Sequence, residues 1–550
     1  MTEGQIKLAD FEKPGRDATQ AIAEAIQYAA THQIETILFE PKTYFLRGKT
    51  TIKTRSIAHD DGCGLLETKD CHLVLKNLKN LTLKGAVDER GRILTVLSGD
   101  NPQLTQARLP SIIWAENCVD LTLENMAFTR SPECAAAGIV ETVDGTTVTV
   151  RTFPGVSCFD GMGAYCMNKF ELETRSLRTA SITYGFGIED RWQSLGGGLF
   201  AIRNAEIARA VRPGDGLSWH QAGLTDFLLF FGNCRDLSFK NVRVYNTNSF
   251  AILTERCRDI KADGLVLKPK AHQFFTGPRD GWKIYRCTGR ILLNNCHIEG
   301  VRMDGQNVHS SFMVCREILG ANSALFSCKY APLDLEADTF FQFYRGAETY
   351  LVKVADWSFA GSYQEESRDE KMEGAAKAVT GTVNNYTLYR LVFTEKIPAF
   401  VREGTLGMPT CWEPEAYHCA NSTFLNIAGA GHLLRCGRAV IENCTYRNIM
   451  NAGILVGAEL STHCEGGHAA GVRISNCSFE NCGFKPRYGK HGIGCIASKA
   501  QGFTEAVNKD LVIENCAFAN SARAIELCNV QNVSIRNCQY HEIGEEVFLA

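Results

Sequence analysis

Two aspartates that lie 24 positions apart are the residues of this sequence best suited to acid–base chemistry. Asp280 and Asp304 each precede a glycine, in the segments RDG and MDG, and the stretch between them alternates apolar and polar residues as short strands do. If the chain coils with this period, the two carboxyl groups lie side by side. Such a pair can protonate a leaving oxygen and activate a water. An aspartate before a glycine can also merely shape a turn, so spacing alone leaves both roles open.

A third carboxylate, Glu465, lies in the segment GAELSTHCEGGHAAG, which also carries Glu459 and the histidines His463 and His468. A zinc site requires ligands at defined spacing on a rigid frame, and two histidines around a double glycine do not provide one. No metal is therefore expected, and the segment favours acid–base or hydrogen-bonding work by Glu465. The catalytic candidates are Asp280, Asp304 and Glu465.

Polar and aromatic residues near the aspartates are candidate contacts to a substrate. Trp282 can present a stacking face to a sugar ring, but the alternation of the strand can equally turn it into the core. His309 can bond a sugar hydroxyl or hold the Asp304 turn. The substrate-binding candidates are Trp282, Arg302, Asn307, His309 and Glu459.

A repeating pattern must position these residues. Three or four alternating residues, an Asn or Gly corner and a second short strand recur, as in ENCVDLTLENMAF from residue 116, GNCRDLSFKNVRV from 232, and later GVRISNCSFENC and NVSIRNCQYHEI. Corner spacings of about 22 residues and more suit one turn of a parallel β-helix with variable loops. The regular leucines and the helices of a leucine-rich repeat are missing. We expect corner asparagines to pair through their amides and the adjacent cysteines to pack inward.

The other stretches predict a cap and two insertions. Residues 17–45 combine a β-rich strand with an amphipathic helix whose apolar face holds Ile22, Ile26, Tyr28 and Ala29, and they can cover the open first coil. Two regions break the repeat with antiparallel strand patterns, and we expect them to pair into one barrel beside the helix. The expected division is 1–134 for the cap and first coils, 135–222 and 310–415 for the two barrel parts, 223–309 for the central coils with the site, and 416–550 for the last coils.

Length and composition exclude several classes of function. At 550 residues the chain exceeds one ordinary core, which suits a solenoid. The net charge is -3, the isoelectric point is about 6.5 and no basic stripe occurs, so nucleic acid is not an expected partner. No run approaches the roughly 18 apolar residues of a membrane helix, so no membrane partner is expected. The 23 cysteines recur at one place in the repeat, which indicates buried reduced thiols and a cytoplasmic protein.

Several segments together resemble glycoside hydrolase family 110. They are MDGQNVH from Met303, the DGW turn at Asp280 before CTG, AVIEN from Ala439, AGILVG from Ala452 and EGG at Glu465. That family consists of β-helix α-galactosidases, including enzymes that remove terminal α-1,3-galactose. The resemblance implies a right-handed helix and an inverting mechanism without a cofactor. Asp280 matches the family's single aspartate, and Asp304 matches the second residue of its aspartate pair.

The sequence departs from that family at three places. Met303 stands where the first aspartate of the pair belongs, NIAGAGH from Asn426 replaces an arginine-rich segment, and the aromatic residue before the glutamate is replaced. Methionine can neither donate nor accept the proton that inverting hydrolysis moves.

The sequence thus predicts an all-β protein, a right-handed parallel β-helix with a helical N-terminal cap and inserted antiparallel barrel-like strands. It is expected to remove a terminal α-linked sugar from an oligosaccharide or glycoside without a cofactor, and α-galactose is the preferred candidate for that sugar. A non-catalytic sugar-binding relative and a pectate-type lyase on the same scaffold are the alternatives, and a homodimer is left open.

Overall fold

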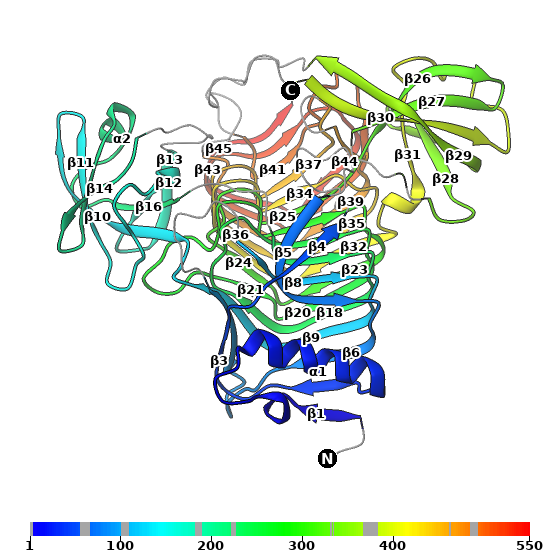
Figure 1. Cartoon of the computed structure of the whole chain (residues 1–550). Helices are drawn as coiled ribbons and strands as arrows, with labels where there is room; N and C mark the ends of the chain where they lie inside the picture. The colour runs from blue at the N-terminus through cyan, green and yellow to red at the C-terminus, as the bar shows by residue number, and fades with distance from the viewer. Residues whose placement is uncertain are drawn as a thin grey trace.

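The main body of the protein is a parallel β-helix whose coils stack from the N-terminal to the C-terminal end, as the computed structural model shows (Figure 1). The structure describes residues 4–54, 67–100, 109–181, 190–221, 227–329, 333, 335–366, 383–460, 464–484 and 493–549. The prediction of an all-β solenoid from the repeats is confirmed.

Three parallel ladders of short strands run along the helix, one strand of each ladder to a full coil. The first ladder contains β5 (Glu67–Lys76), β8 (Ser111–Glu116), β17 (Phe227–Gly232), β19 (Phe250–Glu255), β22 (Trp282–Tyr285), β25 (Gln306–Ser311), β34 (His432–Leu434), β37 (Ile454–Val456) and β41 (Ile496–Ser498). The strand β4 (Thr50–Thr54) pairs antiparallel with β5, and β38 (Glu465–Gly466) pairs antiparallel with the end of β25.

The second and third ladders close each coil. The second ladder contains β1 (Gln5–Lys7), β2 (Thr36–Leu38), β6 (Lys79–Lys84), β9 (Val119–Ser131), β18 (Arg235–Val244), β20 (Arg258–Asp263), β23 (Thr288–Asn294), β32 (Ala416–Ala420), β35 (Ala439–Glu442), β39 (Ala470–Ser475), β42 (Asn508–Glu514) and β44 (Val530–Arg536). The third ladder contains β3 (Thr43–Leu46), β7 (Thr95–Asp100), β21 (Val266–Leu267), β24 (His297–Glu299), β33 (Thr423–Ile427), β36 (Thr445–Ile449), β40 (Ser478–Cys482), β43 (Ala517–Leu527) and β45 (Gln539–Leu549), and β9 and β18 bend into it.

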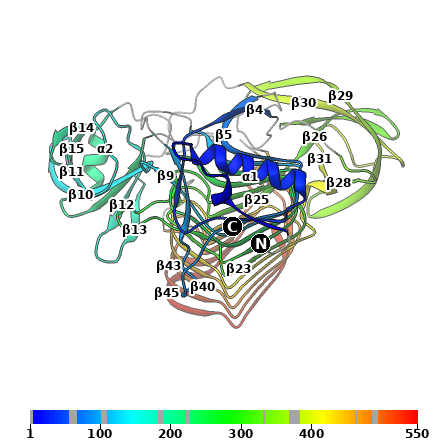
Figure 2. The ribbon, with the colours of Figure 1, turned by 60° about the horizontal axis from the view of Figure 1, so that its bottom comes forward.

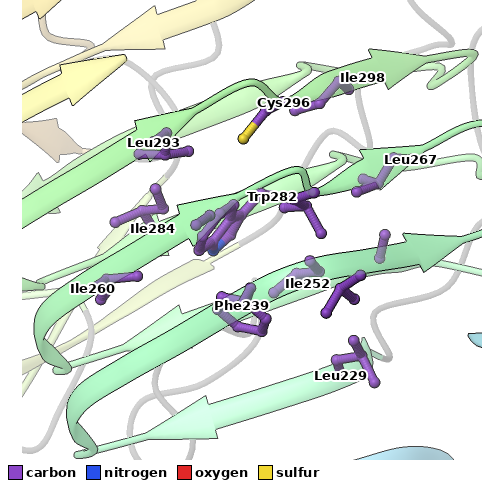
Figure 3. Close-up of a cluster of buried hydrophobic side chains, with 14 of the residues drawn as sticks. Leu229, Phe239, Ile252, Ile260, Leu267, Trp282, Ile284, Leu293, Cys296 and Ile298 are labelled. Atoms are coloured by element: carbon purple, nitrogen blue, oxygen red, sulfur yellow. The ribbon is translucent and has the colours of Figure 1, made fainter. Parts of the chain in front are cut away.

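Alternation along each strand turns every second side chain into the coil. Ile252, Trp282 and Ile284 of the first ladder meet Leu293 and Ile298 of the other two ladders in one continuous buried core (Figure 3). Burial of this apolar surface is the main stabilising contribution to the solenoid.

Asparagines at the coil corners form the expected side-chain ladders. Asn233 donates its amide to Asn117 on the preceding coil over 2.6 Å, and Asn537 donates to Asn515 over 3.4 Å. These four residues have φ between 51° and 56°, a left-handed conformation that asparagine tolerates better than most side chains. The same residue type therefore shapes the corner and joins one coil to the next.

The cysteines next to the corners point inward, as predicted. All 22 described cysteines are free, and all but four of them are buried; the four are Cys158, Cys411, Cys528 and Cys538. Cys63 lies outside the described residues. A small apolar group fits the crowded corner, and a free thiol behaves as one.

The helix α1 (Ala18–His32) caps the first coil, with the short 3-10 helix η1 (Leu8–Phe11) beside it. Asp17 caps its N-terminus by accepting from the Thr19 amide, and Ile22, Ile26 and Ala29 are buried against the coil as predicted. Tyr28 was expected on the same face, but its side chain is 40% exposed and packs edge-on against Phe11. No helix among the described residues is long and apolar enough to span a membrane.

The two insertions form two separate sheets, so the expectation of one shared barrel is wrong. The first is a seven-stranded sheet of β10 (Ala135–Asp144), β11 (Thr147–Thr152), β12 (Tyr165–Glu171), β13 (Ser176–Ser181), β14 (Gln193–Gly196), β15 (Leu199–Arg203) and β16 (Gly216–His220), with helix α2 (Ala205–Ala210). The second is a closed barrel of β26 (Met313–Gly320), β27 (Ser323–Cys328), β28 (Phe340–Arg345), β29 (Glu348–Glu366), β30 (Val383–Phe393) and β31 (Leu406–Pro409), followed by η2 (Thr410–Trp412). They flank the coil on opposite sides (Figures 1 and 2).

Each insertion closes upon itself because its described strands pair only with other strands of the same insertion. The β10–β11 hairpin turns at the predicted Asp144-Gly145 pair, and the barrel is built from similar antiparallel neighbours. Local closure costs less chain entropy than pairing strands across the central coils. The seven-stranded sheet therefore flanks one side of the coil and the closed barrel flanks the other (Figure 1).

Candidate active site

The two aspartates stack on neighbouring coils, as their 24-residue spacing predicts. Asp280 lies two residues before β22 and Asp304 two residues before β25, and these strands pair in register from Trp282 with Gln306 onward. The Gly281 amide donates to the Asp304 carbonyl over 2.9 Å. Adjacent coils in such a ladder are about 4.8 Å apart, so the two carboxylates are neighbours.

Hydrogen bonds hold both carboxylates. The Asp304 amide donates to Asp280 Oδ1 over 3.3 Å, and Asn307 Nδ2 approaches Asp280 Oδ2 at 3.4 Å. The Ala430 amide, one coil further on, donates to Asp304 Oδ1 over 2.8 Å. Asp280 is 4% exposed and Asp304 is 9% exposed, so this pair is ordered and largely shielded from solvent.

Gly429 leaves room for the Asp304 carboxylate. A Cβ atom at position 429 would lie 2.6 Å from Asp304 Oδ1, closer than real Cβ contacts come. The Met303 backbone lies against the same glycine, and the Met303 side chain is buried. The segment that replaces the arginine-rich stretch of the resembled family therefore contacts the Asp304 turn directly.

Glu465 lies at a different place on the same ladder. Its strand β38 runs beside the last residues of β25, and its carboxylate pairs with the Arg435 guanidinium and lies 3.6 Å from His309 Nε2. His309 comes five residues after Asp304, which is about 16 Å along an extended strand. Glu465 therefore lies beside the end of β25, whereas Asp304 precedes the beginning of that strand and has Asp280 as its immediate neighbour.

The other residues around Glu465 support its turn. His309 Nδ1 bonds the Ser310 carbonyl at 2.9 Å, and its ring lies 4.8 Å from the ring of Tyr285. Glu459 is buried, and its backbone amide donates to the Glu465 carbonyl over 3.0 Å. His463 lies outside the described residues. Sequence reasoning missed Arg435. The residue lies beside His309 on the neighbouring coil, as the hydrogen bond from the Arg435 amide to the Val308 carbonyl shows, and this alignment was the one feature that could have identified it.

Trp282 does not have a face for a sugar, contrary to the expectation. It is fully buried inside the coil, where its ring packs edge-on against Phe239 and its indole N–H donates to Thr254 Oγ1 over 3.1 Å. The alternation of side chains along the strand allowed Trp282 to point either inward or outward, and in the structure it points inward. Trp282 is therefore a core residue.

Arg302 does not line the site either, because its guanidinium turns into the seven-stranded sheet. It donates to Asn168 Oδ1 over 2.5 Å, to His220 Nδ1 over 2.9 Å and to Ser218 Oγ over 3.1 Å, and it lies over the Phe275 ring at 3.7 Å. Among the described residues no carboxylate pairs with it. Burial lowers the pKa of the Arg302 guanidinium to about 9. Arg302 thus ties the Asp304 turn to the sheet.

A second arginine links the same sheet to the Asp280 turn. The Arg279 guanidinium lies over the Phe250 ring at 4.8 Å and interacts with the Tyr165 side chain of β12. Burial raises the pKa of the Tyr165 phenol, and the charge of Arg279 partly opposes that shift. Both aspartate turns are therefore connected to one insertion.

The described residues contain no group of three or more His, Cys, Asp or Glu side chains arranged to hold a metal ion. What they bring together is a stacked carboxylate pair. Donors to this pair include the side-chain amide of Asn307 and the backbone amides of Asp304 and Ala430.

Comparisons with known proteins agree on the fold and give distant sequence similarity. Residues 411–549 match the family described as right handed beta helix region, which gives the handedness of the coil. The chain is 22% identical over 524 residues to alpha-1,3-galactosidase A of Shewanella woodyi, covering 88% of this chain and 77% of that one. It is 25% identical over 259 residues to alpha-1,3-galactosidase B of Phocaeicola vulgatus, covering 46% of this chain and only 41% of that relative.

Solved structures give a weaker likeness. The polygalacturonase of Erwinia carotovora has a TM-score of 0.38 and 9% identity over 99% of this chain and 96% of that chain. The mannuronan C-5 epimerase A-module of Azotobacter vinelandii has a TM-score of 0.35 and 10% identity over 99% of this chain and 97% of that chain. Values this low carry no argument about the site.

Proposed function

We propose that this protein is a glycoside hydrolase that removes a terminal α-linked sugar, most specifically α-galactose, from an oligosaccharide or glycoside. The observation that carries the proposal is the stacking of Asp280 and Asp304 on neighbouring coils, within one hydrogen-bonded network. The distant similarity to alpha-1,3-galactosidases supports the sugar and the linkage. We place the chain near glycoside hydrolase family 110 as a diverged relative.

The proposed mechanism is inverting and requires no cofactor. One carboxylic acid protonates the glycosidic oxygen while the other carboxylate activates a water on the opposite face of the sugar ring. Inverting enzymes separate these groups by about 6.5 to 9.5 Å. Residues on coils about 4.8 Å apart can reach that separation when their side chains diverge. Glu465 lies beside the end of β25, where its carboxylate pairs with Arg435, and we assign it to substrate binding together with Arg435 and His309.

Two amide substitutions and two substrates test the pair and separate the two roles. Asp280→Asn and Asp304→Asn keep the size and most hydrogen bonds, and each is expected to lower kcat on an unactivated α-galactoside by roughly 10²-fold or more. An activated aryl α-galactoside needs little help from an acid, so the acid variant recovers on it and the base variant does not. Glu465→Gln is expected mainly to raise KM. Full activity in Asp304→Asn would refute the pair.

A non-catalytic sugar-binding relative is the second candidate, and two observations favour it. Met303 replaces one carboxylate of the resembled family, and the two remaining aspartates are 4% and 9% exposed. Absence of turnover on a panel of aryl α- and β-glycosides, with measurable sugar binding, would select this candidate. Met303→Asp is the complementary test, because it is expected to raise α-galactosidase activity in a weakened enzyme.

A further inference from the structure

A carboxyl group that the proposed mechanism does not use lies where the barrel meets the coil. Glu413 is the first residue after η2, and its Oε1 atom is inaccessible to solvent. Gln342 of β28 donates its Nε2 to Glu413 Oε2 over 3.0 Å, and the Gly437 backbone amide bonds the same carboxyl group. The Glu413 side chain therefore reaches from the barrel to the coil.

Two glycines leave room for this carboxyl group. A Cβ atom at position 437 would lie 3.1 Å from Glu413 Oε1, and the three heavy atoms nearest to it would all belong to Glu413. A Cβ atom at position 467 would lie 3.0 Å from the same oxygen and 3.2 Å from the Tyr344 hydroxyl. Contacts this close are tighter than ordinary Cβ contacts, so a side chain at either position would press on Glu413.

Each of these glycines follows one member of the Arg435–Glu465 pair by two residues. The Gly467 amide donates to the Arg435 carbonyl over 2.9 Å, so the two segments are also joined to each other. Arg435 is 8% exposed and Glu465 is 7% exposed, which leaves the pair little freedom to adjust by itself. Glu413 thus contacts both backbone segments that carry the pair.

The surroundings of Glu413 favour its neutral form. Burial raises the pKa of the Glu413 carboxyl group, and the hydrogen bonds from Gln342 and Gly437 only partly oppose that shift. A neutral acid keeps its size and its hydrogen bonds without placing a third charge near Arg435 and Glu465. Glutamine has the same shape and no charge, so Glu413→Gln is the conservative replacement.

We propose that Glu413 is a positioning residue, which aligns Arg435 and Glu465 for the substrate by holding the backbone two residues after each of them. The inference rests on the function proposed above, in which this pair binds the sugar, and it adds a residue next to the barrel that controls the pair. Loss of the Glu413 side chain would let both segments shift. The aspartates, which precede the other end of β25, would keep their contacts.

Kinetics on an aryl α-galactoside test this role. Glu413→Ala is expected to raise KM about tenfold with kcat within about twofold of the wild type, whereas Glu413→Gln keeps the wild-type KM. Glu415→Ala, at a glutamate two residues further on whose side chain is 63% exposed, is the matched control and is expected to change neither constant. An unchanged KM in Glu413→Ala, or a loss confined to kcat, overturns the proposal.

A glycine substitution tests whether the contact itself transmits the effect. Gly437→Ala presses a methyl group on Glu413, so it is expected to raise KM in the wild-type background and to add nothing in the Glu413→Ala background. Gly320→Ala, whose new methyl group meets Ser323 on the β26–β27 hairpin, is the control. Effects of Gly437→Ala and Glu413→Ala that add in the double variant overturn the proposal. Gly437→Ala alone remains informative if Glu413→Ala fails to fold.

An inactive wild type would refute the hydrolase proposal and still leave the role of Glu413 open to test. Calorimetry with methyl α-galactoside then replaces kinetics, and weaker binding to Glu413→Ala with unchanged binding to Glu413→Gln supports the role. If this sugar does not bind, denaturant unfolding decides. The losses of midpoint from Glu413→Ala and from Arg435→Gln are expected to be less than additive, because both loosen the same contact. Equal binding to all variants, or full additivity of the midpoints, overturns the role.

Discussion

The two insertions attach to the coil by different chemistry and reach different parts of the candidate site. The seven-stranded sheet contacts the coil where Phe170 packs against Phe274 and where the sheet accepts hydrogen bonds from Arg302. Arg302 lies two residues before Asp304. The barrel attaches through Arg286, whose guanidinium lies 3.5 Å from the Trp412 ring. It also attaches through an aromatic cluster of Phe312, Tyr344 and His468 beside the Glu465 turn.

This difference teaches how one solenoid can separate two tasks. Polar, directional bonds at the sheet orient the aspartates, where proposed chemistry depends on geometry to within fractions of an ångström. At the barrel, aromatic packing of Phe312, Tyr344 and His468 lies beside the turn of Glu465, where we expect substrate binding to tolerate more adjustment. We therefore expect damage on the sheet side to lower kcat and damage on the barrel side to raise KM.

The largest effect is expected from Trp412→Ala on the barrel side. Trp412 is 2% exposed, and truncation of a buried tryptophan costs about 3 to 5 kcal/mol of unfolding free energy. Denaturant unfolding measures the loss, and the kinetics are expected to show a raised KM with little change in kcat. Trp357→Ala, on the exposed side of β29, is the control. A fall in kcat with an unchanged KM would contradict the assignment of substrate binding to the barrel side.

Arg302→Met tests the sheet side and is expected to cost about 3 kcal/mol. It leaves His220, Asn168 and Ser218 without their buried donor, and each unsatisfied group costs about 1 kcal/mol or more. Displacement of the Asp304 turn is expected to lower kcat about tenfold or more. Arg302→Lys keeps the charge but not the planar fork, so it should recover stability only in part.

Arg178→Met serves as the control for this variant, because that arginine lies on β13 of the same sheet with its side chain 46% exposed. It is expected to change neither stability nor kcat. If Arg302→Met raises KM and leaves kcat intact, the sheet does not orient the aspartates.

The smallest effect concerns acid and His468 at the barrel contact. Burial lowers the pKa of His468 to about 3, so the folded protein keeps this imidazole neutral while the unfolded chain protonates it below its ordinary value of about 6.5. The unfolded state then binds more protons, so below about pH 6.5, toward pH 3, His468 contributes a loss of stability of about 1.4 kcal/mol per pH unit. The buried histidines His72, His220 and His432, whose pKa burial also lowers, add to the loss.

His468→Phe is expected to reduce the slope by about 1.4 kcal/mol per pH unit, and thermal unfolding between pH 7 and pH 5 measures the difference from the wild type. His541→Gln, at an exposed histidine of β45, should keep the slope of the wild type. An identical pH dependence of stability in His468→Phe and in the wild type would show that protonation of His468 does not destabilise the folded protein.

Much of the candidate site was predictable from local spacing. The 24-residue interval placed Asp280 beside Asp304 because one coil of this region has that length and parallel ladders keep register. The same alternation could not decide whether Trp282 points inward. A strand has two faces, and only the packing against Phe239 shows which one is buried.

Arg302 and Arg435 could not be assigned from spacing at all. The partners of Arg302 lie between 82 and 134 residues earlier, in an insertion whose docking no local pattern encodes. Arg435 meets Glu465 only because β34 continues the ladder of β25 after the whole barrel has been bypassed. The pairing of the insertions was wrong for the same reason, since strand pattern does not name a strand's partner.

Sequence periodicity was enough for the coil, its asparagine corners, its inward cysteines and the stacked aspartates, because each depends on contacts that recur at one repeat length. Tertiary structure alone decided which side each insertion covers, which arginine serves which carboxylate, and where Glu465 lies relative to the aspartates. Those contacts join residues at unrelated separations along the chain. Their energies depend on burial and geometry, which appear only once the coils and insertions are assembled.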